Sequence, residues 1–124
     1  MVSIHKTAVI GSNVVIGNNV SIGPYAVIDD NVKIANDNII KSSVFITGNT
    51  DIGNANIFYP FCSIGSPPQD LKFKNEVTNL IIGSNNIFRE HATVNVGTKG
   101  GGGTTKVGDN SLFMIGAHIA HDCN

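Results

Sequence analysis

The chain has 124 residues, of which 41% are hydrophobic and only 14% are charged, and its formal net charge at pH 7 is -1. Its eight Lys and Arg residues are scattered, so no basic stripe could follow a nucleic-acid backbone, and no apolar run approaches the roughly 20 residues of a membrane span. We therefore expect one small, elongated, soluble domain over residues 1–124, in the cytoplasm, with no nucleic-acid partner.

Large apolar residues recur at every sixth position through the first half of the chain. This anchor row consists of Ile4, Ile10, Ile16, Ile22, Ile28, Ile34, Ile40, Ile46, Ile52, Phe58 and Ile64. A helix repeats every 3.6 residues and a strand every 2, so neither alone produces a period of six. The pattern predicts a solenoid in which a short strand and a corner alternate, with each anchor directed at one axis.

A second row of residues follows each anchor by four positions. It reads Ala8, Val14, Val20, Ala26, Val32, Asn38, Val44, Thr50, Asn56 and Cys62. Each member of this row stands two residues before the next anchor. Because side chains alternate between the two faces of a strand, the second row should point inward like the anchors. Most of its members are small or β-branched, as a narrow interior requires.

The corners between strands should need backbone angles that few residues adopt. We expect positive φ angles at the glycines and asparagines that recur near the corners, since both residue types adopt them at low cost. These candidates are Gly11, Gly17, Gly23, Gly53, Gly65, Asn13, Asn19, Asn31 and Asn49.

Two segments interrupt the repeat and predict loops. The first, residues 66–79, reads SPPQDLKFKNEVTN and begins with prolines, which cannot continue a strand ladder. The repeat returns at Ile82, is broken again over residues 97–105, and resumes at Val107. Insertions in repeat proteins commonly gather on the binding face, so these two loops are candidates for that face.

The glycine-rich segment GTKGGGGTTKVG does not fit a Walker phosphate loop. That motif needs Gly-Lys directly before Ser or Thr and then a helix, whereas Lys106 follows Thr104 and Thr105 and leads into the next repeat. A connector between coils is the simpler interpretation.

Both cysteines stand four residues after an anchor, which predicts that they are packed, inward-facing thiols. Cys62 follows Phe58 in this way, and Cys123 follows Ile119. A disulfide or a catalytic cysteine remains an alternative, but the spacing is not paired and a reducing compartment disfavours a bridge.

The stretch AHIAHDC places three chemically useful side chains around the anchor Ile119. His118 directly precedes the anchor and His121 follows it by two, so both should lie on the outer surface, with Asp122 beside them. Solvated surface histidines and a functional site are about equally good interpretations of this grouping alone.

Three segments of the chain resemble a known enzyme family. QDLK at residues 69–72, GGGTTKVG at 101–108 and AHIAHDC at 117–123 are similar, in this order and spacing, to the acyl-[acyl carrier protein]:UDP-N-acetylglucosamine O-acyltransferases of lipid A synthesis. The resemblance implies an all-β fold, a left-handed parallel β-helix of hexapeptide repeats with coils of about 18 residues. It covers essentially the whole chain and corresponds to the N-terminal half of the family.

The resemblance also implies roles for individual residues. His121 matches the general base that takes the proton of the glucosamine 3-hydroxyl, and Asp122 matches the carboxylate that orients its ring. The residues matching groups that hold the sugar nucleotide are Gln69, Asp70, Lys72 and His118. The family implies acyl carrier protein and UDP-N-acetylglucosamine as partners, a homotrimer with sites between subunits, and no metal or cofactor.

The chain departs from the family in two respects. It ends at Asn124, where family members continue, so we expect this chain alone to be inactive for lack of the backbone donor to the oxyanion, and to associate through its uncapped strand edge. Val96 stands where the family has a basic residue.

Two alternatives from other functional classes remain at this point. A zinc enzyme of the γ-carbonic anhydrase type could use His91, His118 and His121, although this would leave the QDLK segment unexplained. A non-catalytic solenoid would leave the histidines as idle surface.

Overall fold

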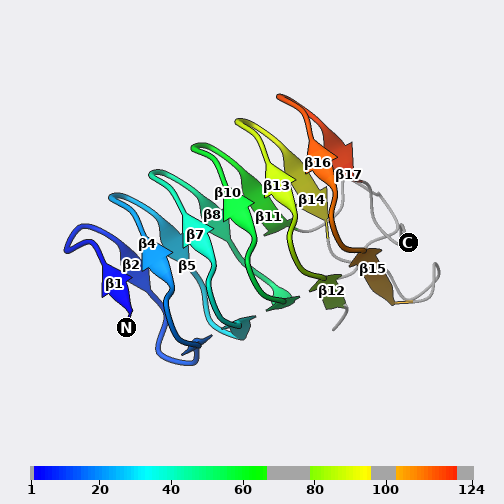
Figure 1. Cartoon of the computed structure of the whole chain (residues 1–124). Helices are drawn as coiled ribbons and strands as arrows, with labels where there is room; N and C mark the ends of the chain where they lie inside the picture. Colours follow the sequence, from blue (N-terminus) through cyan, green and yellow to red (C-terminus); the bar gives the residue numbers. More distant parts are fainter. Residues whose placement is uncertain (1, 67–78, 96–102, 120–124) are drawn as a thin grey trace.

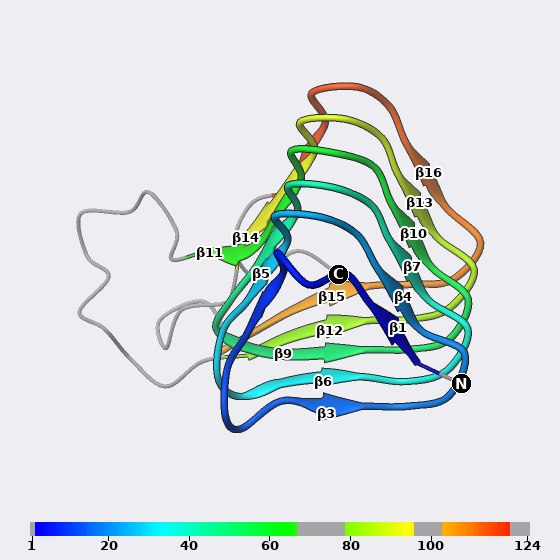
Figure 2. The same ribbon diagram turned by 90° about the vertical axis from the view of Figure 1, so that its left-hand side faces the viewer.

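A computed structural model describes residues 2–66, 79–95 and 103–119 of the chain. Seventeen short strands occupy these residues, and all of their pairings are parallel. The strands form three sheets that make the faces of a triangular prism, and the chain winds around this prism coil after coil (Figures 1 and 2). The expected left-handed parallel β-helix is confirmed. No helix in the described ranges is long and apolar enough to cross a membrane.

Each sheet takes one strand from every coil. The first sheet contains β1 (Ser3–Ile4), β4 (Ser21–Ile22), β7 (Ile39–Ile40), β10 (Ile57–Phe58), β13 (Ile87–Phe88) and β16 (Leu112–Phe113). The second contains β2 (Val9–Ile10), β5 (Val27–Ile28), β8 (Phe45–Ile46), β11 (Ser63–Ser66), β14 (Thr93–Asn95) and β17 (His118–Ile119). The third contains β3 (Val15–Ile16), β6 (Val32–Ile34), β9 (Asn49–Ile52), β12 (Asn79–Ile82) and β15 (Thr104–Val107).

The pairing register repeats every 18 residues, as expected, and both interruptions leave it unchanged. Ser3 pairs with Ser21, and Ser21 pairs with Ile39. Across the first interruption Ile57 pairs with Ile87, and across the second Ile87 pairs with Leu112. The columns of side chains on either side of each interruption therefore stay aligned, apart from a shift in the pairing of β11 with β14 between Ile64 and Ser66.

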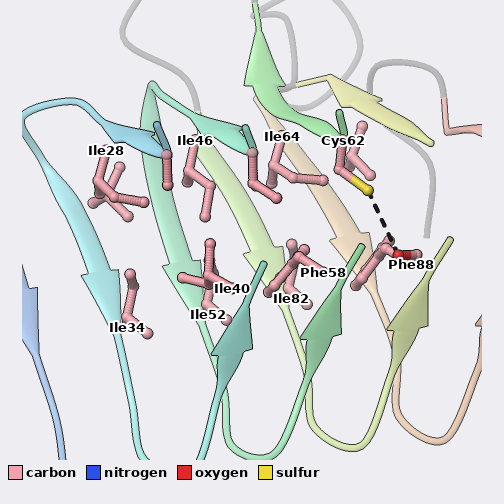
Figure 3. Packing of buried hydrophobic residues seen from close by; sticks show 14 of the residues in the cluster. Ile28, Ile34, Ile40, Ile46, Ile52, Phe58, Cys62, Ile64, Ile82 and Phe88 are labelled. Atoms are coloured by element: carbon pink, nitrogen blue, oxygen red, sulfur yellow. Dashed lines mark hydrogen bonds between the residues drawn. The ribbon is translucent and has the colours of Figure 1, made fainter. Parts of the chain in front are cut away.

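The anchor row fills the interior of the prism, as Figure 3 shows for its middle coils. The anchors from Ile22 onward are buried, and at the first-sheet face the row becomes a stack of aromatic rings. The ring centroids of Phe58 and Phe88 lie 4.8 Å apart, as do those of Phe88 and Phe113. Packed rings and aliphatic side chains fill the axis of the prism, so a ligand could bind only on its outer faces.

Three asparagines of the second row form a buried ladder along the axis. The backbone N–H of Asn56 donates to the side-chain oxygen of Asn38 at 2.8 Å, and that of Asn86 donates to the side-chain oxygen of Asn56 at 2.9 Å. Each side-chain NH₂ group donates to a corner carbonyl, for example Asn56 to Gly83 at 2.9 Å. Buried amides are thus satisfied by the coils on either side.

The expected corner angles are only partly confirmed. Asn19, Asn31 and Gly65 have positive φ, but none of the other glycines or asparagines expected to do so has it. The other left-handed positions are occupied by asparagines and glycines that were not predicted, such as Asn85 and Gly48, and by other residue types, such as Tyr25, Ser43 and Phe61.

Close approach of coils explains the glycine at Gly53, where the expected positive φ is wrong. A Cβ atom there would lie 2.5 Å from the carbonyl oxygen of Gly83 in the next coil. Small size, rather than backbone freedom, is therefore what this corner requires.

We predict that Asn56→Ala lowers the free energy of unfolding by about 2 to 4 kcal/mol, because it removes the partners of the Asn86 N–H and the Gly83 carbonyl inside the prism. Asn18→Ala is the matched control, since Asn18 is exposed and, among the described residues, its hydrogen bonds are made by its backbone groups. This control should change stability by less than about 0.5 kcal/mol. Equal effects of the two substitutions in urea unfolding would contradict the ladder.

Candidate functional site

The structure describes one of the six predicted site residues, His118. The other five lie outside the described residues, and their roles stay predictions. They are Gln69, Asp70, Lys72, His121 and Asp122.

His118 lies on β17 with its side chain exposed on the outer face of the second sheet. The predicted outward orientation is therefore confirmed. Its backbone pairs with Thr93 of β14, and Thr93 pairs in turn with Ser63 of β11, so the three side chains form one outer column. The Thr93 hydroxyl lies 2.5 Å from Nδ1 of His118, within hydrogen-bond distance.

A shallow pocket of about 360 Å³ lies beside His118 at the C-terminal end of the described coils. Its polar lining includes Lys106 and Ser111, and its apolar lining includes the anchors Val107, Phe113 and Ile119. These anchors point toward the axis of the prism, so the pocket lies at the end of the described coils and not on an outer face.

Two polar residues of β14, Thr93 and Asn95, were not predicted from the sequence as possible site residues. Thr93 contacts His118 directly, and Asn95, two residues farther along the strand, is only 7% exposed. Within the residues that the structure describes, the side-chain amide of Asn95 has no hydrogen-bond partner. The signal for Thr93 was available, since Thr93 precedes the anchor Val94 just as His118 precedes Ile119.

The zinc alternative required His91 and His118 to converge with a third histidine. His91 occupies a corner between β13 and β14, where its ring stacks on Phe61 with centroids 5.4 Å apart. His118 lies on the face of β17, and the remaining histidine of that set, His121, is outside the described ranges. No three His, Cys, Asp or Glu residues come together as a metal site within residues 2–66, 79–95 and 103–119.

Cys62 is a packed interior thiol, as predicted, and not a nucleophile. It is 1% exposed, and its Sγ donates to the backbone carbonyl of Arg89 at 3.0 Å, with the Phe88 carbonyl at 3.5 Å (Figure 3). Burial raises the pKa of this thiol from 9.0 to about 11. The thiolate is therefore scarce at neutral pH. Cys123 lies outside the described residues.

Comparison with known proteins finds similar sequences and similar structures. Residues 1–30 and 13–48 match the bacterial transferase hexapeptide (six repeats) model. The acyl-[acyl-carrier-protein]–UDP-N-acetylglucosamine O-acyltransferase of Rickettsia peacockii is 54% identical over 121 residues, which are 98% of this chain and 46% of that protein. The chain belongs to this acyltransferase family.

Solved structures of the family have the same fold as this chain. LpxA from Acinetobacter baumannii matches with a TM-score of 0.95 and 44% identity over 97% of this chain. LpxA from Bacteroides fragilis, described as a UDP-N-acetylglucosamine acyltransferase, matches with a TM-score of 0.93 and 45% identity over 96% of the chain. In both cases the match covers 46% of the larger protein, so the chain spans about half the length of the relatives it matches.

We predict that Cys62 makes stability fall between pH 9 and about pH 11. The unfolded thiol loses its proton near its ordinary pKa while the folded thiol keeps it, so ionisation favours unfolding in this window and has no effect below it. Through this group, the free energy of unfolding can fall by at most about 1.4 kcal/mol per pH unit. Urea unfolding with and without Cys62→Ala, both carrying Cys123→Ser, isolates it. Parallel pH profiles would contradict the raised pKa.

Proposed function

We propose that this chain forms part of an enzyme that transfers a 3-hydroxyacyl group from acyl carrier protein to the 3-hydroxyl of UDP-N-acetylglucosamine. The observation that carries the proposal is the 54% identity, over 98% of the chain, to an O-acyltransferase whose name contains both substrates. The exposed position of His118 on the outer face of β17 supports it.

In the proposed reaction His121 acts as the general base. Its imidazole takes the proton of the sugar 3-hydroxyl while the hydroxyl oxygen forms a bond to the thioester carbonyl carbon. The carbon–sulfur bond then breaks, and the leaving thiolate of the carrier protein takes the proton from the imidazolium. Asp122 orients the ring of His121 and stabilises its protonated form. No covalent acyl-enzyme is needed.

The remaining predicted residues hold the sugar nucleotide. Lys72 supplies a positive charge for phosphate oxygens, Asp70 and Gln69 offer hydrogen-bond partners for the sugar, and His118 lies on the outer wall of the coil.

We further propose that the site is completed by a neighbouring copy in a homotrimer in the cytoplasm. Anchors such as Ile64 and Phe88 are fully buried and fill the axis of the prism. A substrate must therefore bind on the outer faces. One convex wall cannot enclose a substrate, whereas a second wall facing it makes a cleft that excludes water.

The test joins this chain to the part of the Rickettsia peacockii relative that it does not cover and measures acyl transfer from 3-hydroxyacyl carrier protein to UDP-N-acetylglucosamine. His121→Ala should lower the rate by about 10²- to 10⁴-fold, the usual contribution of a general base. His5→Ala is the matched control, since His5 is exposed on the first coil and, within the described ranges, its ring hydrogen-bonds to Thr7. A chimera that is active and indifferent to His121→Ala would refute the assignment.

A further inference from the structure

A hydrogen bond links two outer side chains that lie 25 residues apart in the sequence, Thr93 and His118. We infer that Thr93 is a positioning residue, whose hydroxyl holds neutral His118 in the tautomer that carries its proton on Nε2. This inference rests on the proposed function for its role in binding, but the tautomer itself does not depend on that function.

The coil register brings the two side chains together and limits their freedom. Thr93 and His118 are direct partners in the pairing of β14 with β17, and the Thr93 N–H donates to the carbonyl of Ala117 at 2.9 Å. Adjacent parallel strands lie about 4.8 Å apart, so side chains of paired residues stand next to each other on the same face. The β-branched Thr93 is half-buried and has a restricted χ1 angle, so its hydroxyl is a fixed partner.

The direction of the bond follows from the number of protons available. A threonine hydroxyl has one proton to donate, while a neutral imidazole has one N–H and one bare nitrogen. Among the described residues, the Thr93 hydroxyl has Nδ1 of His118 as its hydrogen-bond partner. If the hydroxyl donates to Nδ1, its proton is used and the ring proton remains on Nε2. If the Nδ1–H of His118 donated to the Thr93 oxygen instead, the hydroxyl proton of half-buried Thr93 would not be bonded to the ring.

The tautomer gives His118 and His121 different roles. With Nδ1 occupied by Thr93, His118 presents an Nε2–H donor from an exposed ring on the outer wall. Such a donor suits an oxygen acceptor, such as a phosphate or a sugar oxygen, and has no free lone pair to accept a proton. His118 therefore binds and orients, and proton abstraction is left to His121.

Ring-nitrogen NMR of the histidine-labelled chain tests the tautomer directly. The ¹⁵N shifts of Nδ1 and Nε2 are recorded at a pH where the rings are neutral, in solution or by magic-angle spinning if the chain associates. His118→Gln assigns the His118 signals. We expect a bare, hydrogen-bonded Nδ1 and a protonated Nε2. A protonated Nδ1 on neutral His118 would overturn the inference.

Two substitutions of Thr93 show whether its hydroxyl is responsible. Thr93→Val keeps the shape of the side chain without the hydroxyl, so the Nδ1 signal should move toward that of a free ring. Thr93→Ser keeps the hydroxyl and should retain the original signal. The His5 ring serves as an internal control for the fold, because its own partner is Thr7. An unchanged His118 spectrum in Thr93→Val would also overturn the inference.

Titration of the chimera described above with UDP-N-acetylglucosamine connects the tautomer to binding. Thr93→Val should weaken binding by about 2- to 10-fold, the range expected for one neutral hydrogen bond, and Thr93→Ser should restore it. If no variant binds the nucleotide, including the unsubstituted chimera, the proposed function fails, whereas the NMR result still decides the tautomer. Binding that is equal in Thr93→Val and the unsubstituted chimera would refute the positioning role.

Discussion

Hydrogen bonding of each coil to the coils on either side is the interaction on which this structure depends. The strands are mostly two residues long, so no strand is stable by itself. Strand ladders, stacked phenylalanines and the buried ladder of Asn38, Asn56 and Asn86 all act between coils. Because most of these contacts join residues one coil apart, the 18-residue register must be kept throughout, and the chain keeps it through two insertions.

This dependence also decides where the protein can carry out chemistry. The interior is filled by one anchor per strand, and the second row adds side chains that are either apolar or bonded to neighbouring coils. A fixed register gives every outer residue a defined neighbour in the next coil, as Thr93 is for His118. The solenoid thus fixes the relative positions of its outer residues. The proposed site combines residues of this outer wall with residues of the inserted segments.

The repeat was readable from the sequence because burial leaves a direct mark on residue type. Ile28 and Ile46 are inward for the same reason that they are apolar, and even the polar Asn56 was correctly placed inside by its position in the hexad. Periodicity does not report hydrogen-bond partners, so the asparagine ladder was not foreseen. The corner angles were predicted correctly at Asn19, Asn31 and Gly65 but wrongly at Gly53, where small size serves close coil packing rather than a left-handed backbone.

The candidate site was predictable only where the repeat extends to it. His118 lies next to an anchor, so its outward direction followed from the hexad, and the same logic identifies Thr93 one coil earlier. Lys72 and Asp70 lie in a segment without the repeat, so no periodic rule gives their direction, and their roles come from family resemblance alone.

The coil register continues across the second insertion and so sets Thr93 beside His118. Scalar couplings across hydrogen bonds, measured by NMR on the isotope-labelled chain, detect this register directly. The account predicts a correlation from the Thr93 amide nitrogen to the Ala117 carbonyl carbon, and one from the Ile87 amide nitrogen to the Ser111 carbonyl carbon. Correlations from these amides to carbonyls displaced by one residue or more would contradict it.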